Sequence, residues 1–173
     1  MDLAALIRNV PDFPKPGIQF KDITTLLLHP EALEYITAVW KDRYSARGLD
    51  AIVAADARGF VFGAALAHAM HLPLVLARKK GKLPADTLAE DYHLEYGTAT
   101  VEIHSDALKP GQRVLLVDDL LATGGTMAAI ARIVRRMGAE IVEAAFVVEL
   151  PPLNGRAALD AIPVHSLVTF MVD

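Results

Sequence analysis

Apolar and polar residues follow two distinct periods along the chain. Short apolar runs lie at 51–55, 73–77 and 114–117. Such runs are typical of strands covered on both faces, as in a parallel sheet with helices on each side. Segments of helical character, with apolar residues gathered on one face, lie at 30–46, 60–70 and 126–137. We therefore predict an α/β domain with a central parallel sheet flanked by helices.

The segments between these elements are polar, short or broken by proline. Residues 2–9 predict a short helix that stops before Pro11, and the prolines and glycine of 9–24 keep that stretch out of helix and sheet. The polar stretch 83–96 lacks a clear period, and a long loop in a compact domain is usually functional, for instance as a lid. Further strands are predicted at 98–104, 139–150 and 164–171, and a further helix at 155–161.

Composition narrows the class of protein. The 173 residues suit one domain, and 53% hydrophobic and 22% charged residues are typical of a globular protein. A net charge of −4 gives no global basic field, so we expect no nucleic-acid partner. The absence of cysteine excludes disulfides and thiolate chemistry and fits the cytoplasm. No signal peptide or membrane-length apolar stretch is recognisable, so we expect no membrane partner.

The densest group of chemically active residues follows the apolar run at 114–117. Asp118 and Asp119 end the predicted strand, and a small glycine-rich turn leads into the next helix. Unpaired N–H groups and a partial positive charge at a helix start favour a phosphate, and ionised carboxylates accept hydrogen bonds from hydroxyl groups. Ribose 5-phosphate offers both partners. The turn consists of Ala122, Thr123, Gly124, Gly125 and Thr126.

Other phosphate loops do not fit this turn. A Walker A loop requires a lysine before its final Ser or Thr, and a dinucleotide fingerprint requires G-x-G-x-x-G; neither is present. The alternative is a purely structural strand–turn–helix, in which the Asp and Thr residues only cap the helix and face solvent. An isolated Asp-Asp or Gly-Gly would favour that alternative, but the complete block in this order favours a binding function.

Two further strand ends carry cations. Asp56-Ala57-Arg58-Gly59 follows the first apolar run, and Arg78-Lys79-Lys80-Gly81-Lys82 follows the second. Arg58 could simply form a surface ion pair, and lysine-rich runs are usually solvated. Their place at the carboxyl ends of strands, next to the phosphate-sized turn, instead favours an anion site.

The segment Val117 to Thr126 resembles the phosphoribosyl-diphosphate (PRPP) motif of type I phosphoribosyltransferases, and its Ala-Thr-Gly-Gly-Thr form resembles the adenine phosphoribosyltransferase branch. The resemblance covers roughly residues 5 to 171, with four motif regions in the expected order. It implies a Rossmann-like type I phosphoribosyltransferase fold in a single domain, 1–173. It also implies an N-terminal hood at 1–30 that receives the base, and a flexible lid loop at 83–97.

The resemblance assigns roles to individual residues. Ribose and the 5-phosphate of PRPP would be held by Asp118, Asp119, Ala122, Thr123, Gly124, Gly125 and Thr126. Pyrophosphate would be held by Asp56, Ala57, Arg58, Arg78, Lys79 and Lys82. Adenine would be held by Ile18, Gln19, Phe20 and Lys21. Family members often have Arg in place of Lys21 and a hydrophobic residue in place of Gln19, departures that matter little if these contacts are made by the main chain.

The implied reaction is adenine plus PRPP giving AMP and pyrophosphate, with Arg58 and Glu95 as catalytic residues. Mg²⁺ would be bound mainly through PRPP and water, with no protein ligand assigned. A homodimer is also implied. Two alternatives remain open: a 6-oxopurine enzyme, which usually has an acid at the position of Ala122, and a PRPP-sensing regulator without catalysis. Known regulators of that kind carry an added DNA-binding domain, for which this chain has neither the length nor a basic face.

Overall fold

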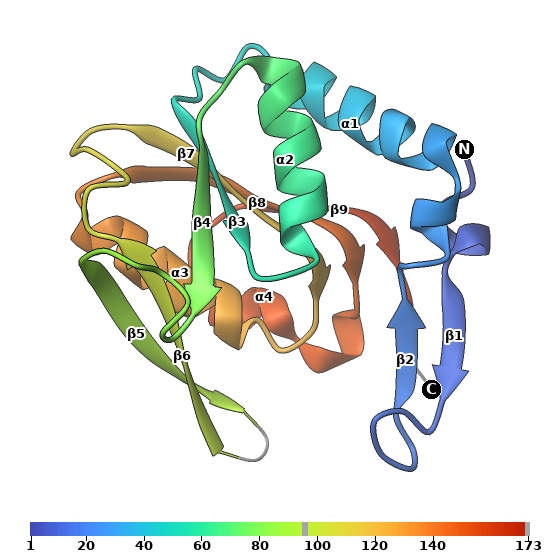
Figure 1. The fold of residues 1–173 in the computed structure, drawn as a ribbon. Coiled ribbons are helices and arrows are strands. Elements are labelled where there is room, and N and C mark those ends of the chain that lie inside the picture. The colour runs from blue at the N-terminus through green and yellow to red at the C-terminus, as the bar shows by residue number, and fades with distance from the viewer. Residues whose placement is uncertain (95–96, 172–173) are drawn as a thin grey trace.

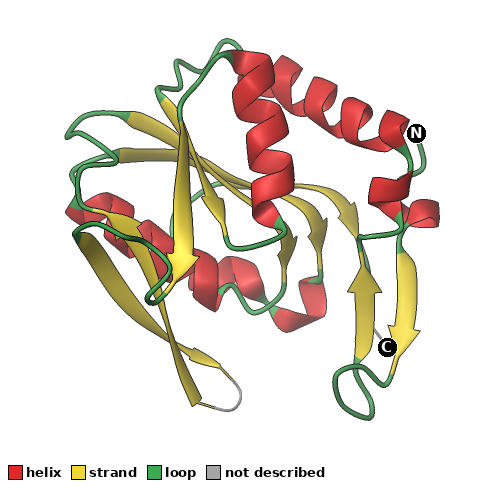
Figure 2. Cartoon of the chain, viewed as in Figure 1, coloured by secondary structure: helices red, strands yellow, loops and turns green. Residues whose placement is uncertain are grey.

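The structure is a computed structural model that describes residues 1–94 and 97–171. Its strands are β1 (Arg8–Pro11), β2 (Gln19–Asp22), β3 (Ala51–Ala55), β4 (Leu74–Lys79), β5 (Thr87–Leu94), β6 (Gly97–His104), β7 (Arg113–Leu121), β8 (Glu140–Glu149) and β9 (Val164–Thr169). The α-helices are α1 (Pro30–Tyr44), α2 (Gly59–Met70), α3 (Gly125–Arg136) and α4 (Gly155–Ala158), with 3-10 turns at Ala4–Leu6, Leu26–Leu28 and Pro151–Leu153. Figure 1 shows their arrangement, and Figure 2 distinguishes helices from strands.

The predicted central sheet is confirmed. Seven strands lie in the order β5-β6-β4-β3-β7-β8-β9, and β3, β4, β7, β8 and β9 run parallel. The α1 and α2 helices cover one face, and α3 and α4 lie at the other (Figure 1). Alternate residues of β3 follow this division, because Val53 packs in the α3 cluster whereas Ile52 packs in the α1–α2 cluster. A strand covered on both faces needs apolar side chains at every position, which explains the unbroken runs.

Trp40 of α1 is a core residue. Its side chain is fully buried, and its ring meets that of Phe62 edge-to-face, with centroids 6.4 Å apart. The α2 helix approaches the sheet closely at Gly63, where an added Cβ would lie 2.6 Å from the Cβ of Ala54. Among the described residues, no helix is long and apolar enough to span a membrane.

The N-terminal arm differs from the prediction. The helix expected over 2–9 is reduced to the 3-10 turn at Ala4–Leu6, and the stretch expected to avoid sheet structure contains both β1 and β2. These strands form a separate antiparallel ribbon, with Arg8 opposite Asp22 and Pro11 opposite Gln19 (Figure 1). The prolines are compatible with this ribbon because one ends β1 and the others lie in the turn beyond it.

The segment predicted as an irregular loop over 83–96 is also different. Residues Thr87–Leu94 form β5, which pairs with β6 along its whole length. Leu88 and Tyr92 of β5 pack against the core cluster that contains α3, while Glu90, on the same face of the strand, forms ion pairs with arginines of that helix. Period-two burial therefore exists, but a charged residue in the middle of the inward face disguises it.

Candidate active site

The carboxyl ends of β3, β4 and β7 meet at one edge of the sheet, where a cleft of about 700 Å³ opens. This arrangement brings together the three segments predicted to bind anions or ribose, at 56–59, 78–82 and 118–126. In open α/β sheets such an edge is the usual ligand position. The cleft is lined by Asp56, Ala57, Arg58, Lys79, Lys80, Tyr92, Ala99, Thr100, Asp118, Asp119, Leu120 and Thr126.

A smaller cavity of about 90 Å³ adjoins the cleft at the turn before α3. It is lined by the whole predicted phosphate segment, Ala122 to Thr126, together with Asp118. Gly124 has a φ of +81°, a conformation open to glycine, and α3 begins at the next residue. The first N–H groups of a helix lack intrahelical partners, so the turn presents donors and a partial positive charge to this small cavity. Its size and chemistry suit a phosphate group.

The acidic pair lies between the two cavities. The main-chain N–H of Asp119 donates to Oδ1 of Asp118 at 2.8 Å, and Nε of Arg58 donates to Oδ2 of Asp119 at 2.5 Å. The start of α2 can lie this close to Asp118 because residue 59 is a glycine: an added Cβ there would be 2.8 Å from Oδ1 of Asp118. Burial raises the pKa of Asp118 well above its usual range, the Asp119 carboxylate raises that pKa further, and the Arg58 charge lowers it. Two close carboxylates in a sheltered site therefore depend on a neighbouring cation.

The raised pKa of Asp118 predicts how the stability of the folded protein depends on pH. A carboxyl whose pKa is higher in the folded than in the unfolded chain opposes folding once the pH exceeds its ordinary pKa of 3.8. We expect Asp118→Asn to raise the thermal unfolding temperature of the unliganded protein near neutral pH. The gain should disappear as the pH falls below 3.8, where both states bind the proton. Unfolding curves across pH test this, and a gain independent of pH would contradict it.

The two cationic segments meet through Asp56. Its Oδ2 accepts from the Arg78 Nε at 3.3 Å and from the Lys79 main-chain N–H at 3.4 Å, and the Asp56–Ala57 peptide bond is cis. Lys79 lines the cleft. Arg78 turns toward the carbonyl oxygen of Lys82, 3.4 Å away, and within the described chain neither Arg78 nor Lys82 is among the cleft residues.

Several cleft residues were not assigned a role from the sequence. Lys80 belongs to the cationic run and lines the cleft beside Lys79, which its position in that run could have indicated. Tyr92, Ala99 and Thr100 reach the cleft from the β5–β6 hairpin. No local motif marks those three, because they enter only through strand pairing between distant parts of the chain.

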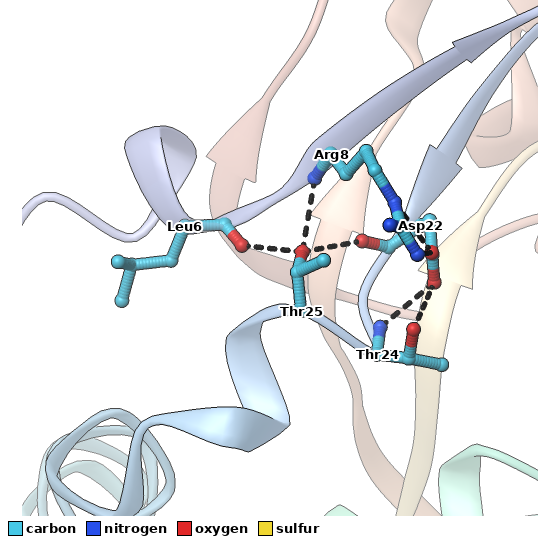
Figure 3. Close-up of polar contacts among 5 residues, drawn as sticks. All are labelled: Leu6, Arg8, Asp22, Thr24 and Thr25. Atoms are coloured by element: carbon cyan, nitrogen blue, oxygen red, sulfur yellow. Dashed lines mark hydrogen bonds and ion pairs between the residues drawn. The ribbon is translucent and has the colours of Figure 1, made fainter.

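The N-terminal ribbon is fastened at its base by a polar cluster (Figure 3). The Thr25 hydroxyl lies 2.7 Å from the carbonyl oxygen of Leu6 and accepts from the main-chain N–H of Arg8 at 3.1 Å. Arg8 forms an ion pair with Asp22 at 2.6 Å, and Asp22 also accepts from the hydroxyl and N–H of Thr24. These hydrogen bonds lower the pKa of Asp22 to about 2. The cluster fixes where the ribbon leaves the domain.

The ribbon carries the residues predicted to hold adenine. Gln19, Phe20 and Lys21 lie in β2 and are half-buried, and Ile18 precedes them. The Phe20 ring centroid lies 5.6 Å from the Arg58 guanidinium, so the ribbon reaches the cleft at this point. Lys21 donates to the Asn9 side chain at 3.0 Å, and Asn9 donates to the Gln19 side chain at 2.7 Å. Since these two side chains bind Asn9, main-chain groups of β2 are the better candidates for contacting a base.

The predicted catalytic residue Glu95 lies outside the described residues. The described residues nearest to it on each side, Leu94 and Gly97, are paired with one another between β5 and β6. The hairpin lies over the phosphate turn, since a Cβ added to Gly125 would be 3.5 Å from the carbonyl oxygen of His93. Within residues 1–94 and 97–171, no group of three or more His, Asp or Glu residues is arranged to hold a metal.

Comparison with known proteins agrees with this geometry. A family model described as "Phosphoribosyl transferase domain" matches residues 22–163. The chain is 54% identical over 169 residues to the adenine phosphoribosyltransferase of Marinobacter nauticus, an alignment covering 96% of this chain and 94% of the relative.

Solved structures agree in both fold and length. The adenine phosphoribosyltransferase of Thermoanaerobacter pseudethanolicus superposes with a TM-score of 0.94 at 47% identity, covering 98% of both chains. The Saccharomyces cerevisiae enzyme, solved in complex with adenine and D-2,5-dideoxy-2,5-imino-altritol 1,6-bisphosphate, superposes with a TM-score of 0.91 at 35% identity, covering 96% of both chains. The chain therefore belongs to the phosphoribosyltransferase family and, within it, to the adenine phosphoribosyltransferases.

Proposed function

We propose that this protein transfers the 5-phosphoribosyl group of PRPP to adenine, giving AMP and pyrophosphate in purine salvage. The observation that carries the proposal is the cleft and its adjoining cavity, where the phosphate turn, the acidic pair and the Arg58 loop converge. A phosphate, a diol and a pyrophosphate held in that order match the three parts of PRPP. The relatives named above carry the same activity in their names.

Different residues along the cleft bind different parts of PRPP. The turn from Ala122 to Thr126 holds the 5-phosphate, and Asp118 and Asp119 accept hydrogen bonds from the ribose hydroxyls. Pyrophosphate lies toward the loop that carries Arg58, with Lys79 on the neighbouring strand end. As pyrophosphate leaves, positive charge develops at C1 of the ribose and negative charge on the leaving group. Arg58 and Lys79 are placed to stabilise that negative charge, and N9 of adenine then attacks C1.

Mg²⁺ is part of the proposal, as the ion that would neutralise the pyrophosphate oxygens. The donor set at the cleft fits an ion bound mainly by PRPP and water. Asp118 and Asp119 offer carboxylate oxygens, but Asp119 is paired with Arg58, and the described residues supply no cluster of three ligands. Mg²⁺ commonly keeps several waters and binds through one or two carboxylates plus substrate phosphates.

The base side of the proposal rests on the ribbon and the hairpin. The contact of Phe20 with Arg58 supports a base seated between β2 and the cleft. We retain Glu95 as the group that handles the proton of the base, from the family resemblance alone. We also retain residues 1–30 as the hood and 83–97 as a lid that moves, the latter now a paired hairpin over most of its length.

The base specificity of the enzyme tests the proposed function. We expect PRPP-dependent pyrophosphate release with adenine to exceed that with hypoxanthine by about 5–150-fold, because a mismatched 6-substituent leaves a buried polar group unpaired at a cost of about 1–3 kcal/mol. A panel of adenine, hypoxanthine, guanine, xanthine and orotate provides the measurement. Equal turnover of hypoxanthine would assign a 6-oxopurine enzyme, and PRPP binding without turnover of any base would indicate a PRPP sensor.

We further propose that the protein is a cytoplasmic homodimer formed from one domain, 1–173. Two large hydrophobic side chains on neighbouring elements support a self-association surface: Val61 of α2 and Leu76 of β4, each 38% exposed. Sedimentation velocity would report the oligomeric state.

A further inference from the structure

The phosphate turn is supported from behind by a part of the chain that does not face the cleft. The α4 segment follows β8 and approaches the turn through two glycines. A Cβ added to Gly155 would lie 2.3 Å from the carbonyl oxygen of Ala122. A Cβ added to Gly124 would lie 2.4 Å from the carbonyl oxygen of Gly155. Main chain therefore packs directly against main chain, with no side chain between that could absorb a displacement.

The neighbouring residue, Arg156, is held by a buried carboxylate. Its Nε and one terminal nitrogen donate to the two oxygens of Glu149 at 2.6 and 2.7 Å, and its other terminal nitrogen donates to the Val164 carbonyl at 3.2 Å. The Ser166 hydroxyl donates to the same carboxylate at 2.6 Å. Glu149 is 4% exposed, and the hydrogen bond from Arg156 lowers its pKa. A bidentate pair of this kind fixes orientation as well as distance.

Glu149 is also fixed relative to the turn. It is the last residue of β8 and lies opposite Leu121, the last residue of β7, and the next N–H, that of Leu150, donates to the Leu121 carbonyl at 2.9 Å. The carboxylate thus occupies a rigid sheet position beside the residue from which the turn departs. Arg156 transmits that position to Gly155, whose main chain contacts Ala122 and Gly124. The α4 segment lies next to the end of β8 and the start of α3 (Figure 1).

We propose that Glu149 and Arg156 are positioning residues that set the shape of the 5-phosphate turn through the main chain of Gly155. Neither contacts the substrate in this arrangement. The ion pair holds α4 against the phosphate turn. The main-chain N–H groups of that turn are thereby kept pointing at the phosphate. This inference rests on the proposed function, because it takes the turn to be the phosphate site. A preorganised set of donors binds better than one that must be ordered at each binding event.

The test compares ribose 5-phosphate affinity in Arg156→Gln with that in a matched control, Arg43→Gln. Arg43 makes an equivalent bidentate pair with Glu143, at 2.8 and 2.9 Å, and Glu143 also accepts from a hydroxyl, that of Tyr44, at 2.6 Å. Glu143 is 3% exposed and lies on the same strand as Glu149, toward the opposite end. Glu143 also lies 3.6 Å from Arg47, so the unfolding temperature of each variant is measured beside its affinity to separate loss of stability from loss of binding.

We expect the dissociation constant of ribose 5-phosphate, measured by calorimetry, to rise about 10-fold in Arg156→Gln and to stay at the wild-type value in Arg43→Gln. Outer residues that orient a binding group typically account for about 10–100-fold in affinity at metal sites, and the lower end is expected for an indirect contact. In turnover assays the KM for PRPP should rise while the KM for adenine stays unchanged. Arg156→Lys, which keeps the charge but not the fork, should recover part of the loss.

A second variant reaches the same turn without touching the ion pair. Gly155→Ala places a methyl group against Ala122 and should weaken ribose 5-phosphate binding in the same way. If Arg156→Gln fails to fold, Gly155→Ala and Arg156→Lys decide the question. Wild-type affinity in these variants, or an equal loss in Arg43→Gln, would overturn the inference. Absence of ribose 5-phosphate binding by the wild-type protein would instead contradict the proposed function.

Discussion

Replacing both Asp118 and Asp119 with Asn is expected to weaken PRPP binding by about 10²–10⁴-fold, since each lost charge-assisted hydrogen bond is worth roughly 1.5–3 kcal/mol. The amide keeps the shape of the carboxylate but loses the charge that attracts the ribose hydroxyls. The two effects need not add, because the residues are in contact through the Asp119 N–H and share the neighbourhood of Arg58. Calorimetry with PRPP and with ribose 5-phosphate measures the loss.

The control for this double variant is a carboxylate that contacts the opposite, amino end of β7. Asp50 accepts a hydrogen bond at 2.8 Å from the main-chain N–H of Arg113, the first residue of β7. Asp50→Asn removes a comparable charge next to β7 but far from its carboxyl end. We expect it to leave PRPP affinity unchanged. Unaltered PRPP affinity in the double variant, with a normal unfolding transition, would remove the acidic pair from the ribose site.

The central sheet could be predicted because it is buried on both faces. Burial on both sides demands apolar residues at every position, so runs such as Val114 to Val117 stand out in a sequence without knowledge of their partners. The phosphate turn could be predicted for a related reason. The strand end, the glycines and the start of the helix are contiguous in the chain, so one stretch of sequence contains all the parts of the phosphate site.

The strand predicted at 98–104 is confirmed as β6, but its partner β5 could not be predicted, because the pattern of β5 depends on residues far away in the chain. Glu90 lies on the inward face of β5 and looks wrong for a strand until Arg132 and Arg136 of α3 are placed opposite it, at 2.6 and 3.1 Å. The role of Arg156 in supporting the turn could not be predicted from the sequence for the same reason. An arginine beside a glycine has no distinctive sequence signature until Glu149 and the turn are brought next to it.

Arg58→Gln is expected to lower kcat by about 10²–10³-fold, the range found when one preorganised donor to developing negative charge is removed. Arg58 donates to Asp119 through Nε, its guanidinium carries further N–H donors on the terminal nitrogens, and its side chain is 47% exposed at the cleft. It can therefore hold the acidic pair and meet the departing pyrophosphate at once. Arg113→Gln is the control, because Arg113 forms an ion pair with Glu140 at the amino end of β7 and its side chain is 40% exposed.

The pH dependence of kcat/KM separates the two roles of Arg58. Its charge lowers the pKa of Asp118, against burial and Asp119, which both raise that pKa. Without the charge the pKa of Asp118 should rise, so the acidic limb of kcat/KM for PRPP should move to higher pH in Arg58→Gln. Arg58→Lys keeps the charge and loses the planar fork, so it should restore the acidic limb while kcat stays reduced. Wild-type kcat in Arg58→Gln would contradict the pyrophosphate role. An unmoved acidic limb would show that Asp118 titrates independently of Arg58.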